Sequence, residues 1–311
     1  MPRWKPLTLL VVGAVMALPA GIASAHEPVA PSVQHVVSAW SLEPGVILAL
    51  VVLAWLYDLG VRSLWQHHGR GRVIGTRQLG AFTGAIITLV VALISPVDAL
   101  ADSLFSAHMA QHMLLVLVVP PLLIVARTDL AVIAAFPPTW QRRGRGLLRH
   151  GAGHRLVQAL LHPATAWWLF AAVFWAWHAP VLYEAALHHD SVHALEHAAL
   201  LLVGLAFWRV VLREAGRRPF AYPLAILFVF TTMLQMSVLA ALLTFSPYAW
   251  YPDYGASTAL WGLSTLTDQR IGALVMWMTS NAVFLGLIAM LFARWFAAEE
   301  RRASHYAPNT P

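Results

Sequence analysis

Long apolar stretches alternate with short polar loops along this chain. A helix needs about 20 apolar residues to cross a bilayer. The stretches that approach or exceed this length are 44–63, 78–95, 107–126, 163–183, 192–212, 221–245 and 270–294. None shows the alternation in steps of two that the strands of a membrane barrel require. The pattern therefore predicts an all-α integral membrane protein, a bundle of seven transmembrane helices.

Two local features interrupt this pattern. Pro120 and Pro121 lie inside the third apolar stretch, where they remove two backbone donors, so we expect a kink there. The segment 128–138 is apolar but too short to cross a bilayer. It is expected to be a surface or re-entrant segment.

The N-terminus has the organisation of a secretory signal. A basic region precedes an apolar run over 7–18, and Ala-Ser-Ala at 23–25 provides the small residues of a cleavage site. We expect residues 1–25 to be removed and 26–311 to form a single seven-helix domain. His26 would then be the first mature residue and could chelate a metal through its amine and its ring. The alternative is an uncleaved anchor helix, which leaves His26 on the same side of the membrane.

Arginine is concentrated in alternate loops. Most of the arginines lie in the loops near 62–77, 127–162 and 209–218 and in the C-terminal tail. Arg270 is the single arginine of the remaining loops. Basic loops are retained on the cytoplasmic side of a membrane. The mature N-terminus is therefore predicted to lie outside and the C-terminus inside, as in a multi-pass protein of a bacterial inner membrane.

Composition limits the chemistry. Hydrophobic residues make up 59% of the chain and charged residues 11%, which is typical of a protein solvated by lipid. The net charge of +6 comes from loop arginines that act as orientation signals, so nucleic acid is not an expected partner. Cysteine is absent, which excludes disulfides and thiolate metal sites. A soft metal would have to be held by histidine, methionine and carboxylates.

Histidines gather at the predicted outer end of three spans. His108 and His112 lie four residues apart at the start of the third span and so project from one helix face. His193 and His197 repeat this spacing at the start of the fifth span, and His178 lies near the end of the fourth. Ionisable groups at membrane depth are costly and usually face a partner inside the bundle. The pattern favours a metal or cofactor site, although hydrogen-bonded links between helices are the alternative.

Other donors are expected at the same level. Met109 and Met113 repeat the four-residue spacing on a neighbouring helix face, and their thioethers suit Cu(I). Zinc would accept the imidazoles too, but methionine beside histidine favours copper. Asp98, Asp102 and Asp268 supply nearby carboxylates. We expect Asp98 and Asp102 to orient ligands or to form part of an access path.

The segment HALEH, 193–197, matches the H-x-x-E-H pattern of zinc hydrolases, in which a glutamate activates water. No second segment clearly supplies the missing carboxylate ligand. Glu196 is therefore expected to orient a ligand, and an intramembrane zinc hydrolase remains an alternative.

Aromatic residues crowd the loop before the last span. They are expected to form an interfacial belt, although a lid over an outer site is the alternative. These residues are Tyr248, Trp250, Tyr251, Tyr254 and Trp261.

Three stretches carry a family resemblance. SPVDALADSLFSAHMAQHMLLVLVVPPLL, WHAPVLYEAALHHDSVHALEHAALLLVGLAFW and DQRIGALVMWM together resemble the multi-spanning CtaG-type cytochrome c oxidase assembly factors. The resemblance implies a non-enzymatic inner-membrane protein that matures a haem-copper oxidase by handling copper. Its partners would be oxidase subunits, a soluble periplasmic copper donor and membrane lipid. The positions carried over are His108, His112, His178, His193 and His197. A copper uptake protein and a b-type haem protein are the competing readings.

Overall fold

A computed structural model describes residues 36–142, 155, 158–215 and 221–306 of this chain. The predicted signal peptide and His26 lie outside the described residues. The described part is all-helical, without strands, and six of its helical segments are long and apolar enough to cross a membrane. These segments are α2 (Pro44–His68), α3 (Thr76–Leu93), Phe105–Val125, Asp190–Arg213, α13 (Tyr222–Phe245) and α15 (Thr265–Tyr306).

The predicted count of seven spans is not confirmed, because the expected span 163–183 is divided. Its first part, α10 (Pro163–Trp177), has 15 residues, about 22 Å of helix against a hydrocarbon core of about 30 Å. The helix ends at His178, and α11 (Pro180–His188) begins after an extended Ala179. The break follows from Pro180, since a residue that precedes proline is disfavoured in the helical region.

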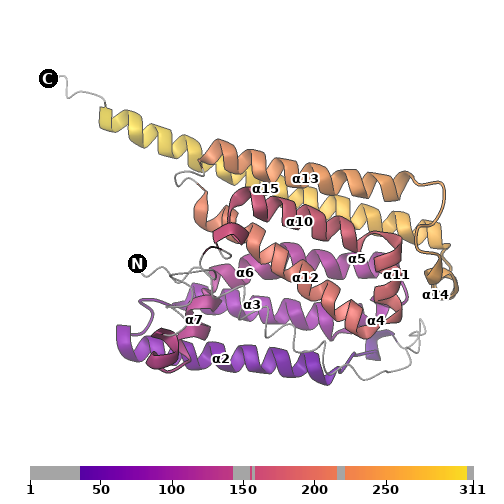
Figure 1. Ribbon diagram of the computed structural model, residues 1–311, viewed down its shortest axis with the longest axis horizontal. Helices are drawn as coiled ribbons and strands as arrows, with labels where there is room; N and C mark the ends of the chain where they lie inside the picture. The colour runs from indigo at the N-terminus through magenta and orange to yellow at the C-terminus, as the bar shows by residue number, and fades with distance from the viewer. Residues whose placement is uncertain (1–35, 143–154, 156–157, 216–220, 307–311) are drawn as a thin grey trace.

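The bundle has two chemically different ends (Figure 1). We call one the histidine end: there α5 (Phe105–Met113) and α12 (Asp190–Arg209) begin, beside α4 (Pro96–Ala101), α11 and α14 (Gly255–Leu260). The opposite end, where α7 (Thr128–Ala134) lies, is the arginine end.

Two spans form the centre of the bundle. Of the most apolar 18-residue windows, those in Phe105–Val125 and Asp190–Arg213 are each 67% buried, against 22–39% in the other four. The central position of these two spans explains why the polar groups at their start can be buried together. The most exposed spans instead present apolar side chains outward, as lipid-facing helices do.

The third span is irregular where the paired prolines lie, and the expected kink stays a prediction. α5 is followed by a π-helical segment, η3 (Leu114–Val118), and then by α6 (Val119–Val125), which contains both prolines. Pro120 cannot donate a hydrogen bond to the carbonyl of Val116, four residues earlier. The indole of Trp208 on α12 donates to that carbonyl instead, at 2.9 Å. Gly204 lets the helices meet here, because a Cβ at this position would lie 3.0 Å from the ring of Pro120.

The short segment predicted near 128–138 forms α7, which packs on α2 rather than crossing the bundle. Gly60 of α2 allows this approach, since a Cβ there would overlap the backbone carbonyl of Ala131. Asp129 of α7 is buried and pairs with Arg209 of α12 at 3.4 Å. This ion pair joins α7 to the central helix at the arginine end.

Candidate metal centre

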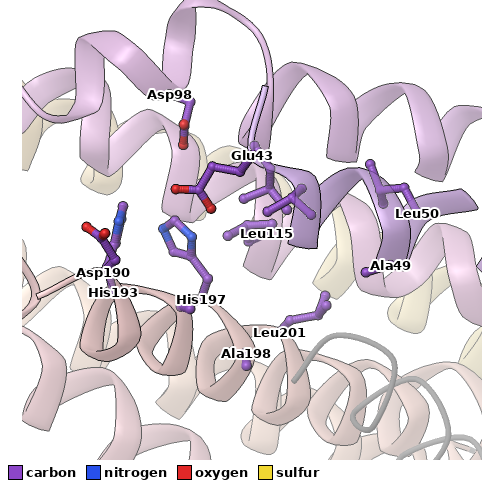
Figure 2. A pocket seen from close by; sticks show the side chains of 13 residues that line it. Glu43, Ala49, Leu50, Asp98, Leu115, Asp190, His193, His197, Ala198 and Leu201 are labelled. Atoms are coloured by element: carbon purple, nitrogen blue, oxygen red, sulfur yellow. The ribbon is translucent and has the colours of Figure 1, made fainter. Parts of the chain in front are cut away.

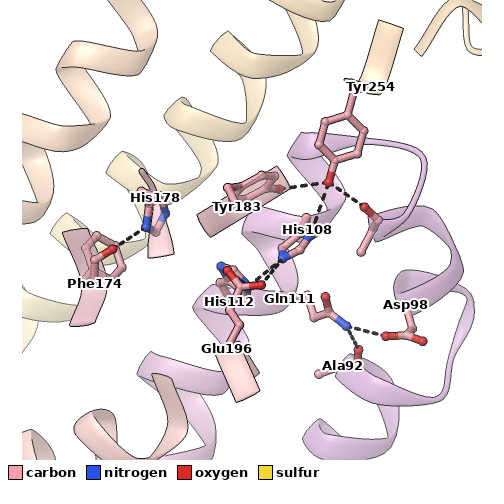
Figure 3. A network of polar contacts seen from close by, with 11 residues as sticks. Ala92, Asp98, His108, Gln111, His112, Phe174, His178, Tyr183, Glu196 and Tyr254 are labelled. Atoms are coloured by element: carbon pink, nitrogen blue, oxygen red, sulfur yellow. Dashed lines mark hydrogen bonds and ion pairs between the residues drawn. The ribbon is translucent and has the colours of Figure 1, made fainter. Parts of the chain in front are cut away.

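Five histidines from three helices meet inside the histidine end, and Figure 3 shows three of them, His108, His112 and His178. His108 and His112 come from α5, His193 and His197 from α12, and His178 caps the end of α10. Ring centroids are 4.3 Å apart for His108 and His112, 5.2 Å for His108 and His193, and 6.2 Å for His112 and His178. The adjacency of these helices, which the sequence could only suggest, is thus present in the fold.

Glu196 lies within this cluster. Its side chain is fully buried, and its two carboxylate oxygens lie 3.6 Å from Nε2 of His108 and 3.6 Å from Nε2 of His112. Neither oxygen has a hydrogen-bond partner in the described part of the chain. Potential ligand atoms fall into two groups, each within 4.8 Å: His108 with His193 and His197, and His108 with His112 and Glu196.

A tyrosine fixes the protonation of one ring. The hydroxyl of Tyr254 lies 3.0 Å from the carbonyl of Ala101, which can only accept, so the single hydroxyl proton is donated there. Tyr254 must then accept from its other two neighbours, the hydroxyl of Tyr183 at 3.0 Å and Nδ1 of His108 at 3.3 Å. His108 therefore carries its proton on Nδ1 and directs the lone pair of Nε2 into the cluster.

His178 is oriented in the same way. Its Nδ1 lies 2.7 Å from the carbonyl of Phe174 and donates to it, so its Nε2 is left with a lone pair. That Nε2 atom is buried without a hydrogen-bond partner in the described structure. The same holds for Nδ1 of His112, Nε2 of His193, Nε2 of His197 and both oxygens of Glu196.

So many unpartnered polar atoms in one place need a physical explanation, because buried polar groups are nearly always hydrogen bonded. A cation among them would satisfy the imidazole lone pairs and the carboxylate together. The donor chemistry fits copper or zinc, both of which accept imidazole nitrogen and carboxylate oxygen. Nε2 of His108 accepts a hydrogen bond of 2.7 Å from Nε2 of His112, which an ion bound by both nitrogens would replace, and two nitrogens on a tetrahedral ion are about 3.3 Å apart. The two rings would therefore separate slightly around an ion.

Aromatic residues close the cluster at its outer side. Tyr251 and Tyr254 are 1% and 2% exposed, so the expectation that they join an interfacial belt is wrong. They instead form the lid considered as the alternative, because the loop folds back over the site. The hydroxyl of Tyr251 donates to the carbonyl of His178 at 2.8 Å, and its ring stacks on Phe105. Tyr248, by contrast, is 67% exposed.

The predicted carboxylates have different positions. Asp98 accepts a hydrogen bond of 2.6 Å from Gln111, whose amide also donates to the carbonyl of Ala92. Burial raises the pKa of Asp98 to about 6. Asp102 is exposed at the end of α4, and neither Asp98 nor Asp102 belongs to the two groups of potential ligands.

Asp268 serves the fold instead of the metal centre. It accepts hydrogen bonds from the backbone amides of Phe105 and Ser106 and thereby caps the start of α5. Met109 and Met113 are buried in the apolar core, and their predicted role as soft ligands stays a prediction.

Sequence reasoning missed Tyr183 and Gln111. Tyr183 lies on α11, after the interruption between α10 and α11, and this short helix has no polar pattern of its own. Gln111 sits one residue from His112 inside an apolar span, and a lone polar residue at that depth was a usable signal.

Known proteins resemble this chain over most of its length. Uncharacterized proteins of Mycobacterium bovis and Mycobacterium tuberculosis are each 28% identical to it over 89% of this chain and 42% of their own length. An uncharacterized protein of Mycobacterium leprae is 25% identical over the same shares. The chain thus spans less than half the length of these curated relatives. No solved structure matches it significantly.

The family described as cytochrome c oxidase caa3 assembly factor, CtaG, matches residues 55–298. The match includes α5, α10 and α12, and therefore all five histidines and Glu196 of the cluster. This chain belongs to the cytochrome c oxidase caa3 assembly factor family.

Proposed function

We propose that this protein binds copper as cargo at the histidine cluster and delivers it to a cytochrome c oxidase subunit during assembly, without catalysing a reaction. The copper would come from a soluble periplasmic donor and be passed on in the bacterial inner membrane. The ligands would be drawn from His108, His112, His178, His193 and His197, with Glu196 as a ligand or as a charge partner. Family membership supports the assembly role.

One observation carries the metal proposal: four imidazole nitrogens and both oxygens of Glu196 are buried in the cluster without a hydrogen-bond partner in the described structure. Tyr254 and Phe174 hold the protons of His108 and His178 on Nδ1. Nε2 of His178 then has no other partner, and Nε2 of His108 accepts only from Nε2 of His112, a hydrogen bond that an ion would replace. Ionised Glu196 would place a negative charge among imidazoles, and a buried charge is costly without a counter-charge. A copper ion supplies that counter-charge.

The size of the space beside the cluster argues against the haem alternative. The cavity that reaches His193 and His197 has a volume of about 80 Å³. Pockets for organic cofactors and ligands usually measure about 300–1,000 Å³. A metal ion with a few water molecules fits this space, whereas a porphyrin does not.

The copper uptake alternative requires a polar path across the bundle. Below the cluster, the two central spans pack through apolar side chains, among them the fully buried Val116 and Leu200. At the arginine end, the buried charges of Asp129 and Arg209 are paired with each other. This packing favours delivery at the histidine end over passage through the membrane.

Metal content measured by mass spectrometry, with an optical spectrum of the same sample, tests the proposal. Purified full-length protein would be loaded with Cu(I) anaerobically and, in separate samples, with Cu(II) or Zn(II). We expect about one copper per chain, no haem absorbance, and loss of the bound copper in His108→Ala/His197→Ala.

The matched control is His67→Ala/His188→Ala, which removes two exposed histidines outside the cluster. It should retain the copper of the parent protein. Equal copper in the cluster variant and the control would overturn the proposed ligand set, and stronger binding of zinc than of copper would overturn the proposed cargo. Oxidase from cells that express the cluster variant should lack copper, because the variant has no metal to deliver.

A further inference from the structure

The histidine cluster is open to its surroundings at one edge. His108, His112 and His178 are at most 1% exposed, and the lid residues Tyr251 and Tyr254 at most 2%. His193 and His197 are less buried as residues and both line a cavity, although their Nε2 atoms are shielded and unpartnered. An ion that reaches the cluster would therefore meet these two rings first.

A cavity adjoins this open edge (Figure 2). It lies between the start of α2 and the start of α12, with α4 and the third span beside it, and both His193 and His197 line it. Its volume of about 80 Å³ has room for several water molecules, each of which needs about 10–15 Å³ on this measure. A partly hydrated ion can thus be accommodated beside the rings.

The cavity is acidic. Glu43, Asp98 and Asp190 line it, and no lysine or arginine is among the described residues that do so. Figure 2 shows the carboxylate of Glu43 between Asp98 and the two histidine rings, with Asp190 next to His193. Clefts lined by charge of one sign concentrate ions of the opposite sign and raise association rates by about 10–1,000-fold.

We infer that the acidic cavity between α2 and α12 is the loading route of the metal centre, and that His193 and His197 are the ligands at which copper enters and leaves. Glu43, Asp98 and Asp190 attract the cation and hold it while water is exchanged for imidazole. His108, His112 and His178 complete the site from the closed side. This inference rests on the proposed function and adds to it the route by which copper reaches the histidine cluster.

The test separates the rate of loading from equilibrium binding. Full-length protein in detergent would be mixed with Cu(I) or Cu(II), whichever ion binds stoichiometrically at equilibrium. The reaction would be stopped at successive times with excess chelator, and the protein-bound copper would be counted. Glu43→Gln/Asp190→Asn should load at least about tenfold more slowly at low ionic strength, with the difference shrinking as salt screens the charges. Its copper content at saturation should match that of the parent, because the histidines are intact.

The control for charge is Glu184→Gln/Asp253→Asn, which removes two carboxylates at the same end but outside the cavity. It should load at the parental rate.

A second pair of variants tests whether filling the cavity with a larger side chain blocks the route. Ala194 lines the cavity and Ala199 of the same helix does not, so Ala194→Leu should slow loading and Ala199→Leu should not.

Parental loading rates in both the charge variant and Ala194→Leu would overturn the inference and place the route elsewhere, for example beneath Tyr254. In that case copper at saturation would still be present, and the proposed function would stand. Absence of copper from the parent protein at equilibrium would overturn both.

Discussion

The hydroxyl of Tyr254 lies 3.3 Å from Nδ1 of His108, although the two residues are 146 positions apart in the chain. The contact joins the loop before the last span to the start of the third. Because the hydroxyl of Tyr254 donates its hydrogen bond to the carbonyl of Ala101, it accepts a hydrogen bond from Nδ1 of His108. The loop is therefore part of the electronic environment of the cluster as well as its lid.

Replacing Tyr254 by phenylalanine should weaken metal binding without removing a ligand. Tyr254→Phe keeps the ring that covers the cluster but loses the acceptor that holds the proton of His108 on Nδ1. Changes to groups that orient a metal-bound histidine typically reduce affinity about 10–100-fold. We expect a loss of this size in a competition titration against a copper chelator.

The control for this change is Tyr248→Phe, which removes a hydroxyl from an exposed residue of the same loop. Its affinity should equal that of the parent. Parental affinity in Tyr254→Phe as well would show that the hydroxyl does not determine the state of His108.

Some of this site could be predicted from the sequence, and the reason is helical geometry. Residues four apart share a helix face, so the sequence alone predicted that His108 and His112 lie on one face of their helix and His193 and His197 on one face of theirs. Their depth followed from the apolar spans that they begin. The contact between these pairs depends on which helices pack together, and helix order along the chain does not determine that.

The features of the site that the sequence did not predict depend on the path of the chain outside the long helices. Tyr251 and Tyr254 have the composition of an interfacial belt, but the loop turns inward and buries them. The span expected over 163–183 ends early because Pro180 lies two residues after His178, and this break places His178 at a helix end facing the cluster. Proline was visible in the sequence, so this boundary could have been predicted.

Glu196→Gln should separate the roles of charge and shape. Without metal, Glu196 has no hydrogen-bond partner in the described structure, and replacing this unpartnered buried ionisable group by a neutral amide should stabilise the protein or leave it unchanged. With copper, the variant loses the attraction between carboxylate and ion. We therefore expect the metal-free variant to melt at or above the parental temperature and to gain less from copper. Glu184→Gln is the control, and an equal gain from copper in Glu196→Gln would contradict a role for its charge.

Close contact between α2 and α7 should depend on Gly60. A methyl group at Gly60 would overlap the carbonyl of Ala131, and backbone cannot move aside as a flexible side chain can. Overpacking of this kind costs about 1–3 kcal/mol. Gly60→Ala should lower the melting temperature in detergent, while Gly286→Ala, with open space around it, should be neutral or stabilising because alanine favours helix by about 1 kcal/mol. Similar shifts in both variants would show that helix propensity alone is at work.

The carboxyl of Asp98 should make stability depend on pH in an unusual direction. Burial raises its pKa from the ordinary value of 3.8 to about 6, against the hydrogen bond from Gln111, which lowers it. Between these two values the folded state binds more protons than the unfolded state, so the stability contributed by Asp98 falls as pH rises through this window. Asp98→Asn removes the titration and keeps an oxygen that can accept from Gln111.

The metal-free Asn variant should accordingly be more stable than the parent at pH 7.5, and the two should converge as the pH falls towards 4. One pKa unit corresponds to about 1.4 kcal/mol, and screening at this half-buried carboxyl reduces the whole effect to about 1–2 kcal/mol. Melting temperatures of both proteins across pH 4–8 would measure it, with Glu184→Gln as the control for loss of one negative charge. A difference between parent and Asp98→Asn that stays constant over this range would mean that Asp98 titrates alike in the folded and unfolded states. Its burial beside the acidic cavity would then carry no electrostatic cost, and a cation would gain nothing from relieving it.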